Sequence, residues 1–152
     1  MKQFAIFVDS AANIPNDIRI ARDIRVIPFH YIVDGEERPC FSEDMPFVET
    51  AKTFYNAMRD GAEAKTSLLP AAVFEEALRP ALQEGRDVLL FTLSSGVSGT
   101  HAQAQEAGRH LQEEFPDRKI FVLDSANASL GEGLIAVKVA DLRDMGESAE
   151  AC

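Results

Sequence analysis

The residues with the clearest chemical potential form one short segment, Ser94–Thr100, which reads Ser-Ser-Gly-Val-Ser-Gly-Thr. It follows an apolar run typical of a buried strand and leads into a helical pattern that starts near Ser98. The start of a helix presents unpaired N–H groups and about half a unit of positive charge. Glycines let the backbone approach a ligand closely, and hydroxyls add donors. This segment predicts a site for a carboxylate or phosphate group, and its candidate ligand-binding residues are Ser94, Ser95, Ser98, Gly99 and Thr100. The alternative is that Ser98 or Thr100 only caps the helix.

Two further polar pairs follow apolar runs. Asp9 and Ser10 come directly after the first run, and Asp124 and Ser125 come after the last. Asp9, Ser10 and Ser125 are therefore candidate ligand-binding residues. Each aspartate could orient a neighbouring hydroxyl, act as a general base, or accept a turn bond from the backbone, which is the commonest role.

Thr66-Ser67 precedes a helical pattern that begins near Pro70. One interpretation is an ordinary helix cap, since proline suits the first turn of a helix. The other is that Thr66 supplies a second hydroxyl to the anion bound at Ser94–Thr100. Both interpretations remain open from the sequence.

A catalytic serine finds little support. A nucleophile elbow needs glycine two residues before and two residues after the serine, and Thr100 occupies the second position relative to Ser98. A base is also needed. The chain has three histidines: His30, His101 and His110. The first falls in a predicted strand, the last on a distant helix, and His101 about one helical turn from Ser98. No lysine follows the glycines as in a P-loop. We predict no catalytic residue and no enzyme activity.

Strand-like and helix-like patterns alternate along the chain. Continuous apolar runs predict strands over 4–8, 24–33, 88–93 and 120–123, as in sheets covered on both faces. Apolar stripes predict helices around 47–58, 74–82, 104–115 and 134–142, and Pro80 should kink or shorten the second helix. The order indicates a single α/β domain with an open, mostly parallel sheet flanked by helices. Ligands bind at the carboxyl ends of the strands in such sheets, where the candidate residues lie.

Composition narrows the class of protein. The chain has 152 residues, the size of one domain, and no apolar run near the roughly 20 residues that span a bilayer. Its start lacks a secretory signal pattern, so we expect a cytoplasmic protein that is not an integral membrane protein. The net charge of -10 argues against a nucleic-acid partner. Cys40 and Cys152 form neither a disulfide framework nor a metal-ligand cluster, and no metal or cofactor is predicted.

Four motifs together resemble a known family. Val8-Asp9-Ser10 with Asn13-Ile14-Pro15 is similar to the opening signature of the DegV family, and Thr66-Ser67 to its second block. Ser94–Thr100 is similar to the family's Ser-Ser-x-x-Ser-Gly-Thr loop. Asp124-Ser125, followed by Ser129, Gly131 and Gly133, is similar to its fourth block. The blocks occur in the family's order and cover nearly the whole chain.

The resemblance implies a fatty-acid-binding protein without a cofactor. In the family the acyl chain lies in a buried tunnel, and the carboxylate is held at the positions of Thr66 and of Ser94 or Ser95. Some members present the lipid to a separate fatty acid kinase, which makes acyl-phosphate for phospholipid synthesis. The alternative function is an enzyme domain that binds a phosphorylated metabolite at the serine-glycine loop, with Asp9 or Asp124 as base. A third is a domain that only dimerises.

The chain departs from the family pattern in three ways. Leu68-Leu69-Pro70 replaces the Gln-Pro that follows Thr-Ser, and His101 stands where tyrosine is usual. Family members are also about twice as long, and their C-terminal half closes the tunnel. Residues 1–152 therefore correspond to the N-terminal domain, with the lipid-closing domain absent from this chain. An unclosed tunnel would expose apolar surface, which predicts a homodimer or a separate C-terminal half as partner.

Overall fold

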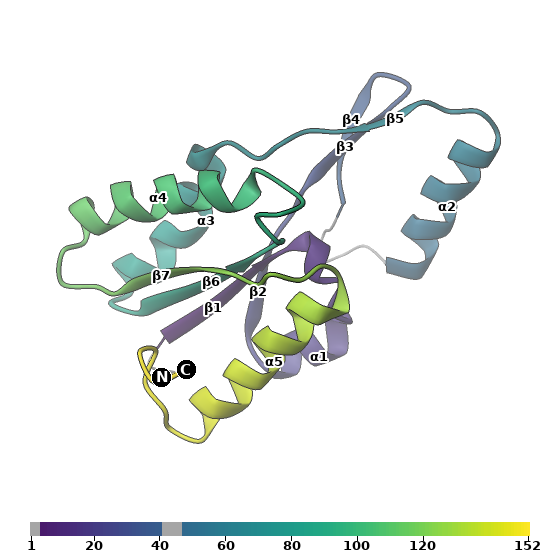
Figure 1. Ribbon diagram of the computed structural model, residues 1–152. Coiled ribbons are helices and arrows are strands. Elements are labelled where there is room, and N and C mark those ends of the chain that lie inside the picture. The colour runs from purple at the N-terminus through teal and green to yellow at the C-terminus, as the bar shows by residue number, and fades with distance from the viewer. Residues whose placement is uncertain (1–3, 41–46) are drawn as a thin grey trace.

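A parallel four-stranded sheet forms the centre of the molecule (Figure 1). The computed structural model describes residues 4–40 and 47–152. The strand order is β2-β1-β6-β7, with β1 at Phe4–Asp9, β2 at Ile24–Ile27, β6 at Asp87–Thr92 and β7 at Ile120–Asp124. All three strand pairings are parallel. The predicted α/β class with an open, mostly parallel sheet is confirmed.

Helices cover both faces of this sheet (Figure 1). Helices α3 (Ala71–Gln83) and α4 (Thr100–Glu114) lie on one face, and α1 (Asn16–Ala21) and α5 (Leu130–Asp144) lie on the other. Strand β1 is buried throughout, because alternate side chains enter the two layers. Phe7 packs in the cluster with Phe74 and Leu78, whereas Ile6 packs with Ala136 and Val139.

The predicted single strand over 24–33 is wrong, because the chain divides there between two sheets. Pro28 and Phe29 separate β2 from β3 (His30–Val33). The Phe29 N–H donates to Ser10 Oγ at 2.9 Å instead of to a strand partner. Strand β3 is the middle of an antiparallel sheet with β4 (Glu36–Pro39) and β5 (Ala64–Thr66), which the sequence did not predict.

This small sheet and helix α2 (Phe47–Arg59) extend away from the main sheet (Figure 1). Two short elements after β1 were also missed: the 3-10 turn η1 (Ser10–Ala12) and helix α1. The four longer helices agree with the predicted ones. Pro80 does not end α3, which continues to Gln83. Ala81 and Leu82 beyond it are buried in the core, and that packing offsets the lost hydrogen bond.

Candidate functional site

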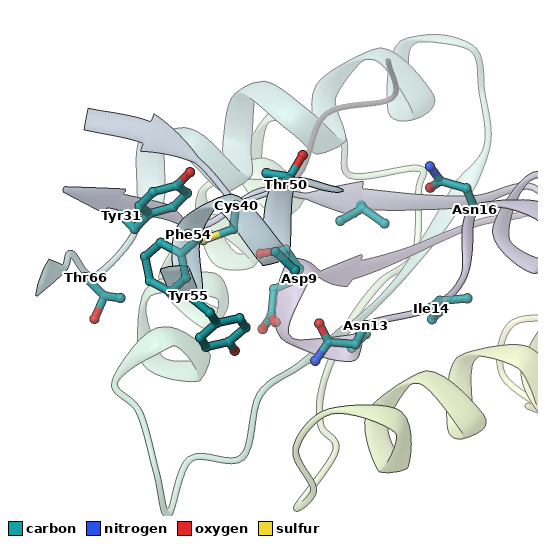
Figure 2. Close-up of a pocket in the computed structure, with 14 residues that line it drawn as sticks. Asp9, Asn13, Ile14, Asn16, Tyr31, Cys40, Thr50, Phe54, Tyr55 and Thr66 are labelled. Atoms are coloured by element: carbon teal, nitrogen blue, oxygen red, sulfur yellow. The ribbon is translucent and has the colours of Figure 1, made fainter. Parts of the chain in front are cut away.

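A pocket of about 280 Å³ opens between the end of β1 and the small sheet (Figure 2). Its walls come from the loop after β1, from β2, from the small sheet and from α2. The described lining residues are Asp9, Ser10, Ala12, Asn13, Ile14, Asn16, Val26, Tyr31, Cys40, Thr50, Ala51, Phe54, Tyr55 and Thr66. Because β1 ends at Asp9, the pocket lies at the carboxyl edge of the parallel sheet, where ligands bind in such folds.

Aromatic and aliphatic side chains make one wall of the pocket. The rings of Tyr31 and Phe54 meet edge to face with centroids 4.8 Å apart, and Phe54 meets Tyr55 in the same way at 5.3 Å. The first contact places α2 against β3. Figure 2 shows Thr66 and these rings at one end of the pocket and Asn13, Ile14 and Asn16 at the other. No lysine or arginine is among the described lining residues.

Asp9 is fully buried where the pocket meets the sheet. Its Oδ1 accepts the Ala11 N–H at 2.9 Å, and its Oδ2 accepts the Leu93 N–H at 2.7 Å. Burial raises the pKa of Asp9 to about 6, against the effect of the Leu93 and Ala11 donors. The predicted turn bond to the backbone is present, and the carboxylate also ties the loop after β1 to the strand end that precedes Ser94.

Ser10 and Thr66 line the same pocket from different elements. Ser10 Oγ accepts the Phe29 N–H, which fixes the crossing between β2 and β3. Thr66 is the last residue of β5 and pairs with Tyr31 of β3. Because the N-cap of α3 is Pro70, the interpretation of Thr66 or Ser67 as that helix's cap is wrong.

The serine-glycine loop leads into α4, whose N-cap is Gly99. Ser98 Oγ accepts the Thr100 N–H at 3.2 Å and lies 2.8 Å from the Thr100 hydroxyl. Ser94 Oγ accepts the Gly96 N–H at 3.2 Å. These bonds order the loop locally. The Thr100 side chain is buried, so of these hydroxyls it is the least accessible to a ligand.

The loop after β7 is bound to the serine-glycine loop. Ser95 donates to Asp124 through both its hydroxyl, at 2.5 Å, and its backbone N–H, at 3.2 Å. The pKa of Asp124 is lowered, chiefly by the Ser95 hydroxyl. Ser125 is buried and exchanges hydrogen bonds with the Asn127 backbone at 3.1 Å. Asp124 thus makes the predicted turn bond, to the Ala126 N–H at 2.9 Å.

Three of the predicted site residues line the pocket: Asp9, Ser10 and Thr66. The other six lie outside its described lining, in the loops after β6 and β7 and at the first residue of α4: Ser94, Ser95, Ser98, Gly99, Thr100 and Ser125. Leu68 connects the two regions, since a β-carbon on Gly99 would lie 3.5 Å from Leu68 Cδ2. The segment that carries Thr66 therefore runs past the start of α4. The ligand-binding roles of all nine residues stay predictions.

The histidines are engaged away from Ser98. His101 Nδ1 lies 2.9 Å from the Thr92 hydroxyl, and His110 Nδ1 lies 2.8 Å from Glu75. His30 pairs with Glu37 at 3.2 Å. Within residues 4–40 and 47–152, no three histidine, cysteine or acidic side chains gather as metal ligands. Over the same ranges no helix has the length and apolar character to cross a membrane.

Sequence reasoning missed the aromatic wall. The sequence predicts a helix around 47–58 whose apolar stripe includes Phe54 and Tyr55; in the structure Tyr55 is 53 % exposed and both residues line the pocket. Tyr31 falls within the predicted strand over 24–33, which gave no sign that it faces a pocket. Cys40 also lines the pocket, and burial raises the pKa of its thiol.

The fold and pocket define a class: a parallel α/β domain with an apolar pocket and a hydroxyl-rich loop at the carboxyl edge of its sheet. A family model described as uncharacterised proteins of the DegV family matches residues 3–152. The chain belongs to the DegV family, as its motifs predicted.

Individual relatives agree with this assignment. The DegV domain-containing protein CPE0026 of Clostridium perfringens is 32 % identical over 148 residues, which are 97 % of this chain and 50 % of the relative. A Thermus thermophilus structure, described as fatty acid binding of a DegV family protein, superposes with a TM-score of 0.81 at 30 % identity, covering 98 % of this chain and 50 % of the other. The chain spans about half the length of these relatives.

Two more structures extend the comparison. Protein TM841 of Thermotoga maritima is described as revealing fatty acid binding function. It superposes with a TM-score of 0.83 at 29 % identity, and the match covers 99 % of this chain and 52 % of TM841. The fatty acid kinase B3 protein of Streptococcus pneumoniae, loaded with linoleic acid, has a TM-score of 0.78 at 23 % identity, over 98 % and 51 % of the two chains. At 23 % identity, the Streptococcus pneumoniae structure shows the shared fold alone.

Proposed function

We propose that this chain binds a long-chain fatty acid. The acyl chain lies against the aromatic wall of Tyr31, Phe54 and Tyr55, and the carboxylate is held by Thr66 and by Ser94 or Ser95. The observation that carries the proposal is the pocket itself, which combines apolar walls with hydroxyls and, among its described lining, has no cationic side chain. Two relatives near 30 % identity are described as fatty-acid-binding.

A carboxylate buried without a cation is costly unless several donors satisfy it. Hydroxyls and helix N–H groups are the donors on offer here. The Thr66 hydroxyl is on the pocket wall, and the serine-glycine loop lies alongside at the start of α4. We place the carboxylate between them, with Ser10 and Ser125 in the surrounding loops and Ser98, Gly99 and Thr100 at the helix start.

The alternative ligand is a phosphorylated metabolite, with Asp9 or Asp124 as a catalytic base. A doubly charged phosphate in a pocket without a described cationic lining is disfavoured, whereas an aromatic wall suits an acyl chain. Both aspartates already accept two or more backbone or hydroxyl donors. We therefore favour lipid binding without catalysis. We also propose that the protein acts in the cytoplasm.

Exposed apolar side chains bear on the choice of partner. We propose that a partner surface, either another copy of this chain or a separate C-terminal half, packs against Leu68, Val97 and Leu130, which are exposed in or beside the loops of the site. Presentation of the lipid to a fatty acid kinase remains a proposal based on the family resemblance.

A palmitate titration of the purified chain tests the function. Thr66→Val removes the proposed carboxylate donor and keeps the shape, and should weaken palmitate binding about tenfold, the effect of losing a hydrogen bond to a charged group. Thr53→Val is the matched control, since Thr53 is exposed on α2 and bonds its own helix at Glu49 O. Equal affinities for the two variants, or competition by millimolar inorganic phosphate, would count against the proposal.

A further inference from the structure

Glu132 carries a buried carboxyl group, and carboxyl groups are seldom buried in proteins. It is in the first turn of α5, with 0 % of its surface exposed. Neither of its side-chain oxygens makes a hydrogen bond of standard geometry to a described residue, and the backbone N–H of Asp9 is the one donor that acts to lower its pKa. A buried carboxylate without a partner is strongly unfavourable, so a group in this position avoids ionisation by keeping its proton.

The start of α5 is pressed against the loop that forms the pocket floor. A β-carbon on Gly133 would lie 2.7 Å from the Ala12 carbonyl oxygen and 2.9 Å from Ile14 Cγ1. Ala12 and Ile14 both line the pocket. Glu132 is therefore held directly behind the pocket by an approach that only glycine permits.

Asp9 is the charged neighbour of Glu132. Burial, and then the negative charge of Asp9, raise the pKa of Glu132 to about 9. The other charged side chains on the strands that α5 covers lie away from Glu132. Arg25 stacks on Phe7 on the opposite face of the sheet, and Asp87 bonds Lys119 N–H at the far end of β6. The turn η1 contributes no charged side chain.

We propose that Glu132, by remaining protonated behind the pocket, limits the buried negative charge beside the pocket to that of Asp9 and so keeps the pocket receptive to an anion. This proposal rests on the proposed function. Asp9 lines the pocket and is fully buried, and because its pKa is raised only to about 6 it carries one negative charge at pH 7.5. A second charge on Glu132 would repel a bound carboxylate across a poorly solvated interior, where such interactions are strong.

The test compares palmitate affinity at pH 7.5 and pH 9.5 in three versions of this chain: the wild type, Glu132→Gln and Glu113→Gln. Glutamine copies the shape of the protonated acid and cannot ionise, and Glu113 is an exposed glutamate on α4. We expect the wild type and Glu113→Gln to bind several-fold more weakly at pH 9.5, and Glu132→Gln to lose much less. Tyr31, Tyr55 and Cys40 also line the pocket, and all three proteins retain them.

Carbon-13 NMR of the side-chain carboxyls in the ligand-free wild type is the second readout. The Glu132 carboxyl should titrate above pH 8, and at lower pH in Asp9→Asn. A Glu132 titration near pH 4.5, or an equal loss of affinity in Glu132→Gln and the wild type, would overturn the proposal. If the proposed function itself is wrong, the wild type will bind no palmitate even at pH 7.5, and this result distinguishes the two failures.

Discussion

At the scale of single residues, two aspartates organise the candidate site through their bonding partners. Asp9 joins the loop after β1 to Leu93, and Asp124 joins the loop after β7 to Ser95. Their environments differ: burial raises the pKa of Asp9, whereas hydrogen bonds lower that of exposed Asp124. The three strand-end loops are thus held in one arrangement by carboxylates, which act as acceptors and leave hydroxyls such as Thr66 available to a ligand.

Glu132 should make the free energy of unfolding of the protein depend on pH. Its pKa is about 9 in the folded chain and near 4.5 when unfolded, so the folded state binds more protons between these values. Its contribution to the free energy of unfolding is greatest below about pH 4.5 and falls until about pH 9. Urea unfolding at pH 5, 7 and 9 should show this decline in the wild type and a flatter profile in Glu132→Gln. Identical profiles for these two proteins would contradict the assignment.

Residue chemistry was predictable where it is local. The turn bonds of Asp9 and Asp124 followed from their places at strand ends, and Thr66 does line a pocket. The aromatic wall was not predictable, because it depends on β3 leaving the main sheet to meet α2. A pattern of apolar residues cannot distinguish a core-facing stripe from a pocket-facing one.

At the scale of elements, the tight contact between α5 and the turn after β1 determines the pocket floor. The helix begins beside η1, and Gly133 allows the Ala12 carbonyl to approach it. The Asn13 side chain bonds Ser129 Oγ at 3.1 Å across the same contact. The pocket is thus supported from behind by a helix that does not line it.

Gly133→Ala should disturb this contact. The new methyl group would meet a backbone oxygen at 2.7 Å, which overpacks the contact and should lower the free energy of unfolding by about 2 kcal/mol. It should also weaken palmitate binding, because the loop carrying Ala12 and Ile14 must move.

Gly96→Ala is the matched control for that change, since its β-carbon would lie an ordinary 3.5 Å from Ser94 Oγ. Denaturant unfolding of both variants provides the comparison, whereas palmitate titration compares Gly133→Ala with the wild type alone because Gly96 lies in the serine-glycine loop. Equal stability of the two alanine variants would contradict the account of the contact.

The elements themselves show what periodicity can and cannot reveal. The buried strands and the four long helices were predicted because continuous apolar runs and 3.6-residue stripes are strong signals. The break at Pro28 was missed because the run of β-branched and aromatic residues continues across it. Strand β5 has only three exposed residues and gives no pattern to recognise.

At the scale of the whole molecule, apolar side chains remain uncovered around the carboxyl edge. We call Leu68, Val97 and Leu130 the apolar rim; each lies in or beside a loop of the candidate site and is exposed. Val97, in the serine-glycine loop, is 72 % exposed. Exposed apolar groups beside a ligand site favour association with a partner surface.

The apolar rim predicts self-association of the chain. Sedimentation velocity of the wild type at tens of micromolar should show a dimer, and Val97→Asp should shift it toward monomer because a charge would be buried in the contact. Ile20→Glu is the control, since Ile20 is 65 % exposed on α1 and is not one of the rim residues. A monomeric wild type, or equal effects of both changes, would contradict this prediction and favour a separate partner chain.

The central claim is that this chain holds a fatty acid by its carboxylate at Thr66 and Ser94 or Ser95. Native mass spectrometry with lipid extraction, on protein purified from a bacterial host, tests it most directly. We predict a co-purifying long-chain fatty acid in the wild type that is lost in Thr66→Val and in the Ser94→Ala/Ser95→Ala double variant, with Thr53→Val unaffected. A lipid-free wild type that also takes up no added palmitate or oleate would contradict the claim.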